Sequence, residues 1–344
     1  MARKQLDPTI TGGVAEKLES DLRAHIVGQE DAIAQIINVF QVFYSGLVAP
    51  MRPLASFLFL GPTGSGKTRI VEALGESLMG DVRAVIKVDC AEYQHSHEIA
   101  KIVGSPPGYL GHRETHPLLS QEVLQSHWTE NCKLSLVLFD EVEKASDALW
   151  NLLLGILDKA TLTLGDNRRV DFSRAMIFMT GNVGAREMAS LTTSPLGFAP
   201  IHGNLDDKIA SSGHEAARKK FTPEFLNRID KIVVFRPLGT AELRKILDLE
   251  LVILQERILH AANTKPFILS ISPVAKDVIL REGTELKYGA RHLKRTIERI
   301  VTQPLANLLA SDQIVAGDQI LVEHDGQKMV FSKDAPPVAK RAKA

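Results

Sequence analysis

The sequence has few cysteines, no net charge and no long apolar run, and each of these shortages excludes a class of protein. Two cysteines in 344 residues, with no C-x-x-C pair, form neither a disulfide framework nor a zinc-binding pattern. We interpret them as buried thiols in a reducing, cytoplasmic compartment. The 41 basic residues balance 41 acidic ones, so the overall charge does not favour binding to nucleic acid or to an anionic membrane.

The apolar residues are also not arranged for a membrane or for secretion. No apolar run is long enough to cross a bilayer, and the N-terminal MARKQLDPTITGG lacks the apolar core of a signal peptide. A hydrophobic content of 44% and a charged content of 24% are typical of a globular protein with a full core. The length predicts about two domains.

One stretch carries a specific chemical signal. Residues 61–68, GPTGSGKT, fit the pattern G-x-x-x-x-G-K-[ST] between a strand predicted at 57–60 and a helix predicted at 67–79. In such a loop the glycines let backbone N–H groups face phosphates, the lysine reaches the β- and γ-phosphates, and the threonine hydroxyl ligates Mg²⁺. The alternative is a glycine-rich turn that contains a lysine. We therefore predict that ATP and Mg²⁺ are held by Gly61, Pro62, Thr63, Gly64, Ser65, Gly66, Lys67 and Thr68.

A second signal follows a predicted strand at 134–139, which ends in Asp140 and Glu141. An apolar strand followed by Asp-Glu is typical of the Walker B motif. Asp140 can support Mg²⁺ through water, and Glu141 can polarise the attacking water. The alternative is an acidic strand end without a role.

The remaining pattern predicts an α/β fold, in which a five-stranded parallel sheet lies between helices and a smaller, mainly helical lid domain with a short sheet follows. The other three strands are expected at 84–88, 175–179 and 231–235, a hairpin at 161–172, helices at 117–130 and 147–158, and a loop at 191–214. We expect a flexible lead-in at 1–12, a large nucleotide-binding domain at 13–237, the lid at 238–332 and a disordered basic tail at 333–344.

Three further positions have two interpretations each. Ile26 and Val27, beside a glycine upstream of the P-loop, could face an adenine ring or simply pack before a helix. Tyr109 and Leu110 lie in GSPPGYLG, whose glycines and prolines predict an exposed loop, although the tyrosine could fold back as a plug. Asn182 follows the fourth strand and could face the ligand crevice or serve as a turn residue.

Together these motifs resemble the Clp family of AAA+ protein unfoldases and disaggregases, over about residues 22–331. The resemblance implies that Asn182 lies near the γ-phosphate and that Arg291, in YGARHLKR, is a second sensor of ATP. It implies that Arg228, in FTPEFLNRID, is an arginine finger that completes a neighbour's site. The alternative for Arg228 is a surface arginine paired with Asp230 or Glu224.

The resemblance also implies partners. By this resemblance, Tyr109 and Leu110 would grip unfolded or aggregated protein in the pore of a homo-oligomeric ring, which is expected to be a hexamer. Residues 196–198, Leu196, Gly197 and Phe198, are similar to a tripeptide by which some members dock a barrel-shaped peptidase. The segment HRETHP at 112–117 departs from the family wording, and the stretch 121–133 is longer than usual.

We therefore expect an ATP-hydrolysing ring motor that threads protein through a central pore. The first alternative is a nucleotide-switched assembly or regulatory scaffold that does not thread protein. The second alternative is a motor on nucleic acid, which the balanced charge disfavours.

Overall fold

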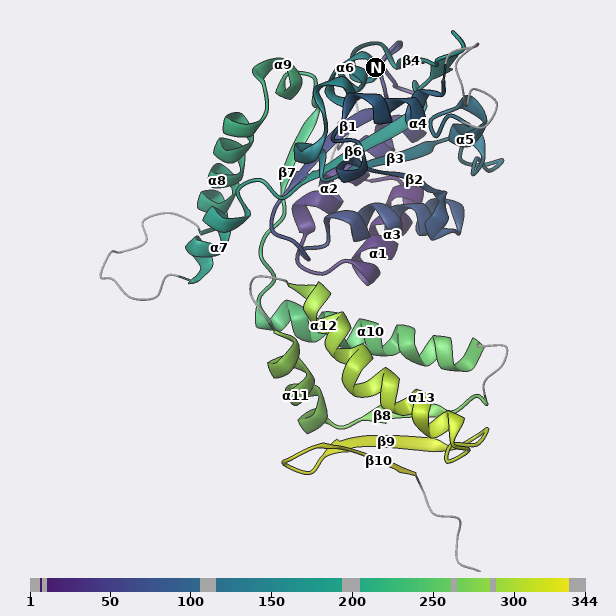
Figure 1. Ribbon diagram of the computed structural model, residues 1–344, viewed down its shortest axis with the longest axis vertical. Helices are drawn as coiled ribbons and strands as arrows, with labels where there is room; N and C mark the ends of the chain where they lie inside the picture. Colours follow the sequence, from purple (N-terminus) through teal and green to yellow (C-terminus); the bar gives the residue numbers. More distant parts are fainter. Residues whose placement is uncertain are drawn as a thin grey trace, which may run out of the picture. The chain divides into compact units, whose positions relative to one another are not determined.

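The computed structural model describes Asp7 and residues 11–105, 116–193, 205–260, 265–284 and 289–333 (Figure 1). The chain divides into two units, residues 1–237 and residues 238–344. None of the helices in the described ranges has both the length and the apolar character needed to span a membrane.

A five-stranded parallel sheet forms the centre of the first unit, as the sequence predicts. Its strands run in the order β2–β3–β6–β1–β7, so the P-loop strand β1 lies between β6 and β7. All four pairings are parallel, which brings the carboxyl ends of the strands to one edge. The bounds are β1 (Ala55–Leu60), β2 (Val85–Asp89), β3 (Ser135–Asp140), β6 (Ala175–Gly181) and β7 (Lys231–Val234).

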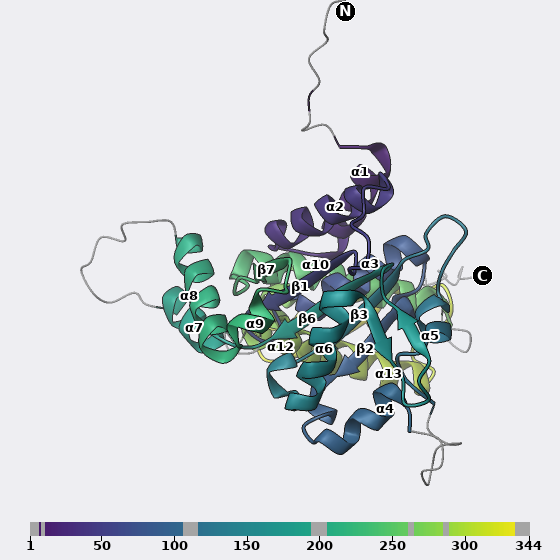
Figure 2. The ribbon, with the colours of Figure 1, turned by 90° about the horizontal axis from the view of Figure 1, so that it is seen from above.

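Both faces of this sheet are buried, which explains why its strands are almost continuously apolar. In β1, Leu58 and Leu60 belong to one hydrophobic cluster, whereas Phe57 and Phe59 belong to the other. The ring of Phe57 stacks on Phe178 of β6 with centroids 5.1 Å apart. The helices α1, α2 and α3 cover the face of Phe57, and α4 and α6 cover the opposite face (Figure 2). Their bounds are α1 (Gly13–His25), α2 (Glu30–Tyr44), α3 (Lys67–Met79), α4 (Ala100–Val103) and α6 (Asp147–Lys159).

The predicted hairpin is confirmed, but the helix predicted at 117–130 is wrong in length. Helix α5 (Gln121–Gln125) starts where the Ser120 hydroxyl accepts the Val123 N–H. Beyond its end the Trp128 ring N–H donates to Ser135 Oγ at 2.9 Å, which attaches the chain to β3 instead of continuing the helix. The hairpin strands are β4 (Thr161–Thr163) and β5 (Arg169–Asp171), and short 3₁₀ helices lie at Val82–Ala84, Cys90–Glu92, Ser96–Ile99 and Val142–Lys144.

The loop predicted at 191–214 is wrong at both ends, because α7 (Ala185–Thr193) continues to residue 193 and the helix α8 (Leu205–Lys220) begins at residue 205. Its serines and Gly213 suggested a loop, but Gly213 instead allows α8 to pack closely against β7. A Cβ at this position would lie 2.7 Å from a methyl carbon of Val234 in β7. Acidic residues in the first turn and basic residues in the last turn also favour the helix. Its neighbours are α7 (Ala185–Thr193) and α9 (Pro223–Leu226).

The second unit is mainly helical with a small sheet, in agreement with the predicted fold class. Its elements are α10 (Thr240–His260), β8 (Ile268–Ile271), α11 (Pro273–Gly283), α12 (Ala290–Ile297), α13 (Gln303–Ala310), β9 (Gln319–His324) and β10 (Met329–Lys333). A π-helical turn at Glu298–Thr302 separates α12 from α13. Pro304 has no N–H to donate to the carbonyl four residues earlier, which accounts for the break in the α-helical pattern.

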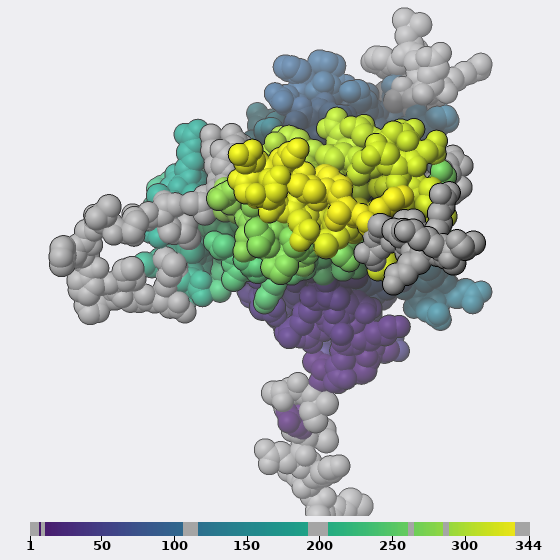
Figure 3. Space-filling view, turned by 90° about the horizontal axis from the view of Figure 1, so that it is seen from below, coloured from purple at the N-terminus to yellow at the C-terminus, as the bar shows by residue number. Residues whose placement is uncertain are grey.

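The sheet of the second unit has the order β10–β9–β8, with β8 parallel and β10 antiparallel to β9. Ile320 and Val322 of β9 are both buried, Ile320 within the hydrophobic cluster of this unit, while Leu321 between them is exposed. One face of the sheet therefore packs on the helices and the other faces solvent. In the space-filling view the yellow atoms of the C-terminal strands form part of the near surface (Figure 3).

Candidate nucleotide site

The P-loop joins β1 to α3 and needs glycine at its two ends. Gly61 has φ of 148°, and a Cβ there would lie 2.6 Å from the backbone oxygen of Phe235. Gly66 has φ of 101° and directly precedes the first residue of α3. Between them Ser65 is buried, and its hydroxyl has no hydrogen-bond partner among the described residues. The loop thus leaves a buried polar atom available beside the N-terminus of a helix, which suits a phosphate.

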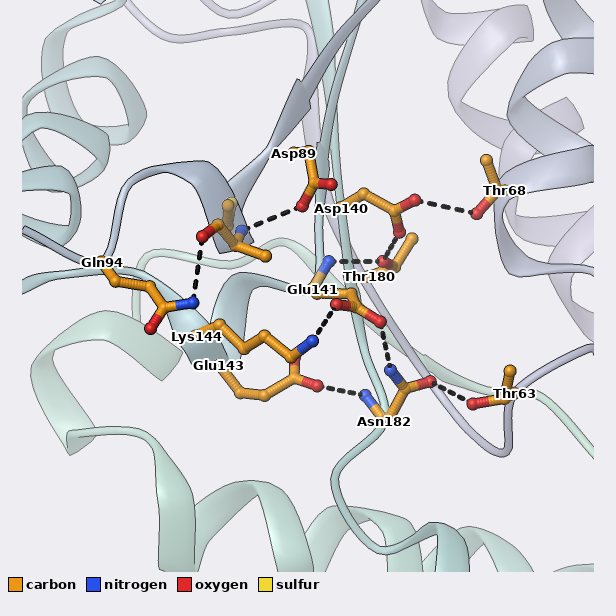
Figure 4. A network of polar contacts seen from close by, with 12 residues as sticks. Thr63, Thr68, Asp89, Gln94, Asp140, Glu141, Glu143, Lys144, Thr180 and Asn182 are labelled. Atoms are coloured by element: carbon orange, nitrogen blue, oxygen red, sulfur yellow. Dashed lines mark hydrogen bonds and ion pairs between the residues drawn. The ribbon is translucent and has the colours of Figure 1, made fainter. Parts of the chain in front are cut away.

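Lys67 and Thr68 point from the first turn of α3 towards the ends of the neighbouring strands. The buried Lys67 ammonium donates to the carbonyl oxygens of Gly61 at 2.7 Å and Pro62 at 2.9 Å. It also donates to Asn182 Oδ1 at 3.1 Å. The Thr68 hydroxyl donates to Asp140 Oδ2 at 3.4 Å (Figure 4). The lysine and threonine of the P-loop therefore contact residues that follow β6 and end β3.

The end of β3 is attached to β6 through a buried hydroxyl. Thr180 Oγ1 donates to Asp140 Oδ1 and accepts the backbone N–H of Glu141 at 3.0 Å (Figure 4). Glu141 has φ of 56°, in the left-handed region that disfavours a side chain. Such backbone conformations cost of order 1–3 kcal/mol and concentrate at functional sites. The turn aims the Glu141 carboxylate towards Asn182.

Asn182 connects the two motifs, as its position after the fourth strand suggested. Its Nδ2 donates to Glu141 Oε1 at 3.2 Å, and its Oδ1 also accepts from the Thr63 hydroxyl at 3.4 Å. Its backbone N–H donates to Glu143 Oε1 at 3.0 Å. The amide therefore lies between Lys67 and Glu141, which a simple turn asparagine would not do.

Lys144 adds a cation on the solvent side of Glu141. Its ammonium pairs with Glu141 Oε2, and this hydrogen bond raises the pKa of Lys144 above its ordinary value. Both oxygens of the Glu141 carboxylate thus have partners, one the Asn182 amide and one the lysine. A water molecule that approaches Glu141 would have to share or replace one of these contacts.

The donor set fits Mg²⁺ with a nucleotide better than a protein-only metal site. Thr68 and Asp140 offer hard oxygen atoms 3.4 Å apart, and Mg²⁺ in phosphate sites takes one or two protein oxygens together with water and phosphate. Among the described residues no group of three or more His, Cys, Asp or Glu side chains could hold a metal alone. Nucleotide phosphates would have to supply the remaining ligands.

Gln29 is a site residue that the sequence analysis missed. Its side chain is 4% exposed and donates to the carbonyls of Ser65 and Arg236, both at 3.0 Å. It also accepts the Arg236 N–H at 3.1 Å, so it bridges the P-loop and the end of β7. The only signal in the sequence was a polar residue directly before an apolar helix. Nearby, Ile26 is buried and Val27 is partly exposed, and the contact of this pair with an adenine stays a prediction.

Arg228 is held by two carboxylates. Its Nε donates to Asp158 Oδ1 at 2.6 Å and its Nη1 to Glu224 Oε1 at 2.8 Å, with 24% of the side chain exposed. The guanidinium lowers the pKa of Asp158, mainly through the hydrogen bond. Of the two carboxylates named for the surface-pair alternative, only Glu224 contacts it. Asp230 instead accepts the Ser56 N–H at 2.8 Å.

The contacts described above do not include the remaining expected site residues. Arg291 is exposed in the first turn of α12 in the second unit. Tyr109 and Leu110 lie outside the described residues, and so do Leu196, Gly197 and Phe198. Their expected roles stay predictions.

Comparison with known families matches both units. Residues 52–232 match the model of an AAA domain of the Cdc48 subfamily, which is a nucleotide-binding module. Residues 238–322 match the C-terminal, D2-small domain of ClpB protein. The resemblance inferred from the motifs is therefore confirmed.

Similar proteins are longer than this chain. The chain is 37% identical over 315 residues to the chaperone protein ClpB of Rhodopirellula baltica, covering 92% of this chain and 34% of that protein. It is 36% identical over 314 residues to the ATP-binding subunit ClpC of the Clp protease of Staphylococcus saprophyticus, covering 91% and 37%. The chain thus spans about a third of these relatives. A closed-state reconstruction of Hsp104 with ATPγS and FITC-casein has a TM-score of 0.77 at 31% identity, covering 94% of this chain and 53% of that one.

Proposed function

The chain belongs to the Clp family of AAA+ ATPases, and we propose that it hydrolyses ATP in a ring and uses the energy to unfold or remodel protein. The observation that carries the proposal is the continuous polar network from the P-loop to the ends of β3 and β6. It places Lys67 and Glu141 on the two ends of one amide, that of Asn182. This arrangement suits a γ-phosphate and an attacking water that must be positioned together.

In this proposal each side chain of the network has one task. Lys67 binds the β- and γ-phosphates in exchange for its carbonyl contacts, and Asn182 orients the γ-phosphate. Glu141 accepts a proton from the attacking water, which requires that its Lys144 contact loosens. When bound, Mg²⁺ neutralises charge on the phosphates, and Thr68 and Asp140 would hold it directly and through water.

The remaining roles are proposed from family membership. Arg228 completes the site of the next subunit in a homo-oligomeric ring, proposed to be a hexamer, and Arg291 senses bound ATP. Tyr109 and Leu110 grip unfolded or aggregated protein in the pore. The name of the Hsp104 structure includes casein, and that of ClpC a protease, which supports a protein substrate for this chain. The two free, buried cysteines suit a reducing cytoplasm.

A nucleotide-switched scaffold is the second candidate. Such a scaffold would bind and hydrolyse ATP with the same network but would not translocate a polypeptide.

The test combines two measurements on the full chain. We expect steady ATP hydrolysis that falls about 10²–10⁴-fold in Glu141→Gln, while ATP binding persists. We expect ATP-dependent loss of fluorescence from a tagged, stably folded reporter protein, and Tyr109→Ala should abolish it while leaving hydrolysis. Hydrolysis without any reporter unfolding would support the scaffold, and near-normal turnover of Glu141→Gln would remove that residue from its role.

A further inference from the structure

We propose that Glu143 is a positioning residue that sets the place of Asn182 between Lys67 and Glu141. This inference rests on the proposed ATPase function but concerns a residue to which none of the motifs above assigns a role. Glu143 lies in the 3₁₀ turn Val142–Lys144, two residues after the proposed base. Its Oε1 accepts the backbone N–H of Asn182 at 3.0 Å, which joins the turn after β3 to the residue that follows β6 (Figure 4).

The contact is one half of a two-point attachment. In one direction the N–H of Glu141 donates to the side chain of Thr180, at 3.0 Å. In the other, the N–H of Asn182 donates to the side chain of Glu143. Each strand end therefore gives a backbone donor to a side chain of the other. The Thr180 contact fixes Glu141, and the Glu143 contact fixes the residue whose amide has to meet both Lys67 and Glu141.

The burial of one Glu143 oxygen atom indicates that this contact has a cost. Its second oxygen, Oε2, is buried and has no hydrogen-bond partner among the described residues. Burying an unpaired polar atom destabilises a fold, so such atoms in native structures call for an explanation. Gly181 leaves room beside this carboxylate, because a Cβ on it would make a tight contact of 3.3 Å with Glu143 Oε2. The strand end is thus shaped to admit this carboxylate although one of its oxygens is unsatisfied.

A role in positioning differs from a role in catalysis or in stability. Glu143 accepts its hydrogen bond from the backbone of Asn182, so its loss would shift the side-chain amide without removing any group proposed to contact the nucleotide. A misplacement of about 1 Å can cost on the order of 100-fold in rate. Because the P-loop and its lysine stay in place, nucleotide affinity should change much less than turnover.

The first test compares Glu143→Ala with Glu143→Gln by steady-state ATP hydrolysis. We expect the alanine variant to lose about 10–100-fold in kcat with KM within roughly 3-fold of the wild type. The glutamine variant keeps an oxygen acceptor for the Asn182 N–H and should stay within about 3-fold in both constants. Glu215→Ala, which breaks an exposed ion pair with Lys219 on α8, is the matched control and should leave both unchanged.

The second test does not depend on turnover. Hydrogen exchange of the Asn182 amide should accelerate roughly 10–100-fold in Glu143→Ala, the equivalent of one hydrogen bond to a charged group, and should stay slow in Glu143→Gln. The melting temperature of Glu143→Gln should equal or exceed that of the wild type, because a neutral amide costs less to bury than a carboxylate oxygen.

The outcomes separate this inference from the proposed function. A wild type without ATPase activity would refute the proposed function, and the exchange measurement would still decide whether Glu143 fixes Asn182. Wild-type turnover in an active Glu143→Ala variant would overturn the inference alone. Glutamine as damaging as alanine would also overturn it, since the carboxylate charge would then matter and not the acceptor. Unchanged exchange at Asn182 would do the same.

Discussion

Replacing Gln29 by methionine should destabilise the first unit and weaken its hold on nucleotide. Methionine has a similar length but cannot form the three hydrogen bonds that join Gln29 to Ser65 and Arg236. Each such bond contributes about 0.5–1.5 kcal/mol, and a buried group left unpaired costs about 1–3 kcal/mol. We therefore expect a loss of roughly 2–4 kcal/mol in the free energy of unfolding. At about 2–4 °C per kcal/mol, the melting temperature should fall by roughly 5–15 °C.

The chain offers both a specific probe and a matched control for this measurement. Its two tryptophans, Trp128 and Trp150, lie in the first unit, so tryptophan fluorescence during heating follows that unit. Gln35 lies on α2, and its side-chain oxygen is buried without a partner among the described residues. Gln35→Met should therefore change the melting temperature by no more than about 3 °C, or raise it slightly, because it removes an unsatisfied atom.

Kinetic measurements on the same variants separate an effect of Gln29 on the P-loop from an effect on overall stability. Gln29 holds a carbonyl of the P-loop and touches no group proposed to react, so Gln29→Met should raise the KM for ATP about 10-fold and change kcat less. Equal melting temperatures for Gln29→Met and Gln35→Met would refute a stabilising role for the Gln29 bridge. A drop in stability while KM stays at the wild-type value would refute an effect on the P-loop, because the bridge would then support the fold without shaping the loop.

Three further outcomes are expected. Arg228→Ala and Glu141→Gln should each be nearly inactive in ATP hydrolysis, since an arginine finger supplied by a neighbouring subunit contributes roughly 10³–10⁵ in rate. Mixing the two variants under subunit exchange should restore part of the hydrolysis. Hydrolysis at the background rate in confirmed mixed rings would exclude a shared site. Phe198→Ala should leave ATP hydrolysis and reporter unfolding intact. We expect no stable, ATP-dependent binding of a barrel-shaped peptidase even by the wild type, and observing such binding would overturn that expectation. Burial raises the pKa of the Cys90 thiol, so alkylation at pH 8 should require unfolding, and rapid labelling of the native protein, read by mass spectrometry, would contradict the buried placement.

The sheet could be predicted from the sequence because its strands are buried on both faces. A strand such as β1, buried at all six positions, is a short apolar run between turn residues. Helix α8 could not be predicted in this way. Gly213 and the serines around it are typical of a loop, and only the contact with Val234 shows why a glycine is needed within a helix. That contact joins α8 to β7, and such a contact between distant elements cannot be predicted from a local sequence pattern.

Some residues of the candidate site could be predicted from the sequence and others could not. Lys67, Asp140 and Asn182 could be placed because each directly follows a predicted strand or opens a helix, and parallel strands bring these ends together. The bridge from Gln29 to Arg236 and the contact from Glu143 to Asn182 could not, because they depend on side-chain directions across 207 and 39 residues of sequence. Motif spacing thus identified the residues proposed to touch the nucleotide but not those that hold them.

The contact between Arg228 and Asp158 affects how strongly Arg228 could act on a phosphate. Asp158 lies 70 residues before it in sequence, and no motif connects the two. The pair of carboxylates engages Nε and Nη1, and none of the described contacts uses Nη2. The clamp therefore holds the guanidinium in one orientation with one end available, which lowers the entropy lost when it meets a phosphate. Two negative charges beside it also offset its field at any anion it meets. Asp158 and Glu224 thus fix the orientation of the guanidinium but weaken its attraction for a phosphate. We therefore expect the rate contribution of Arg228 near the lower end of the range of roughly 10³–10⁵.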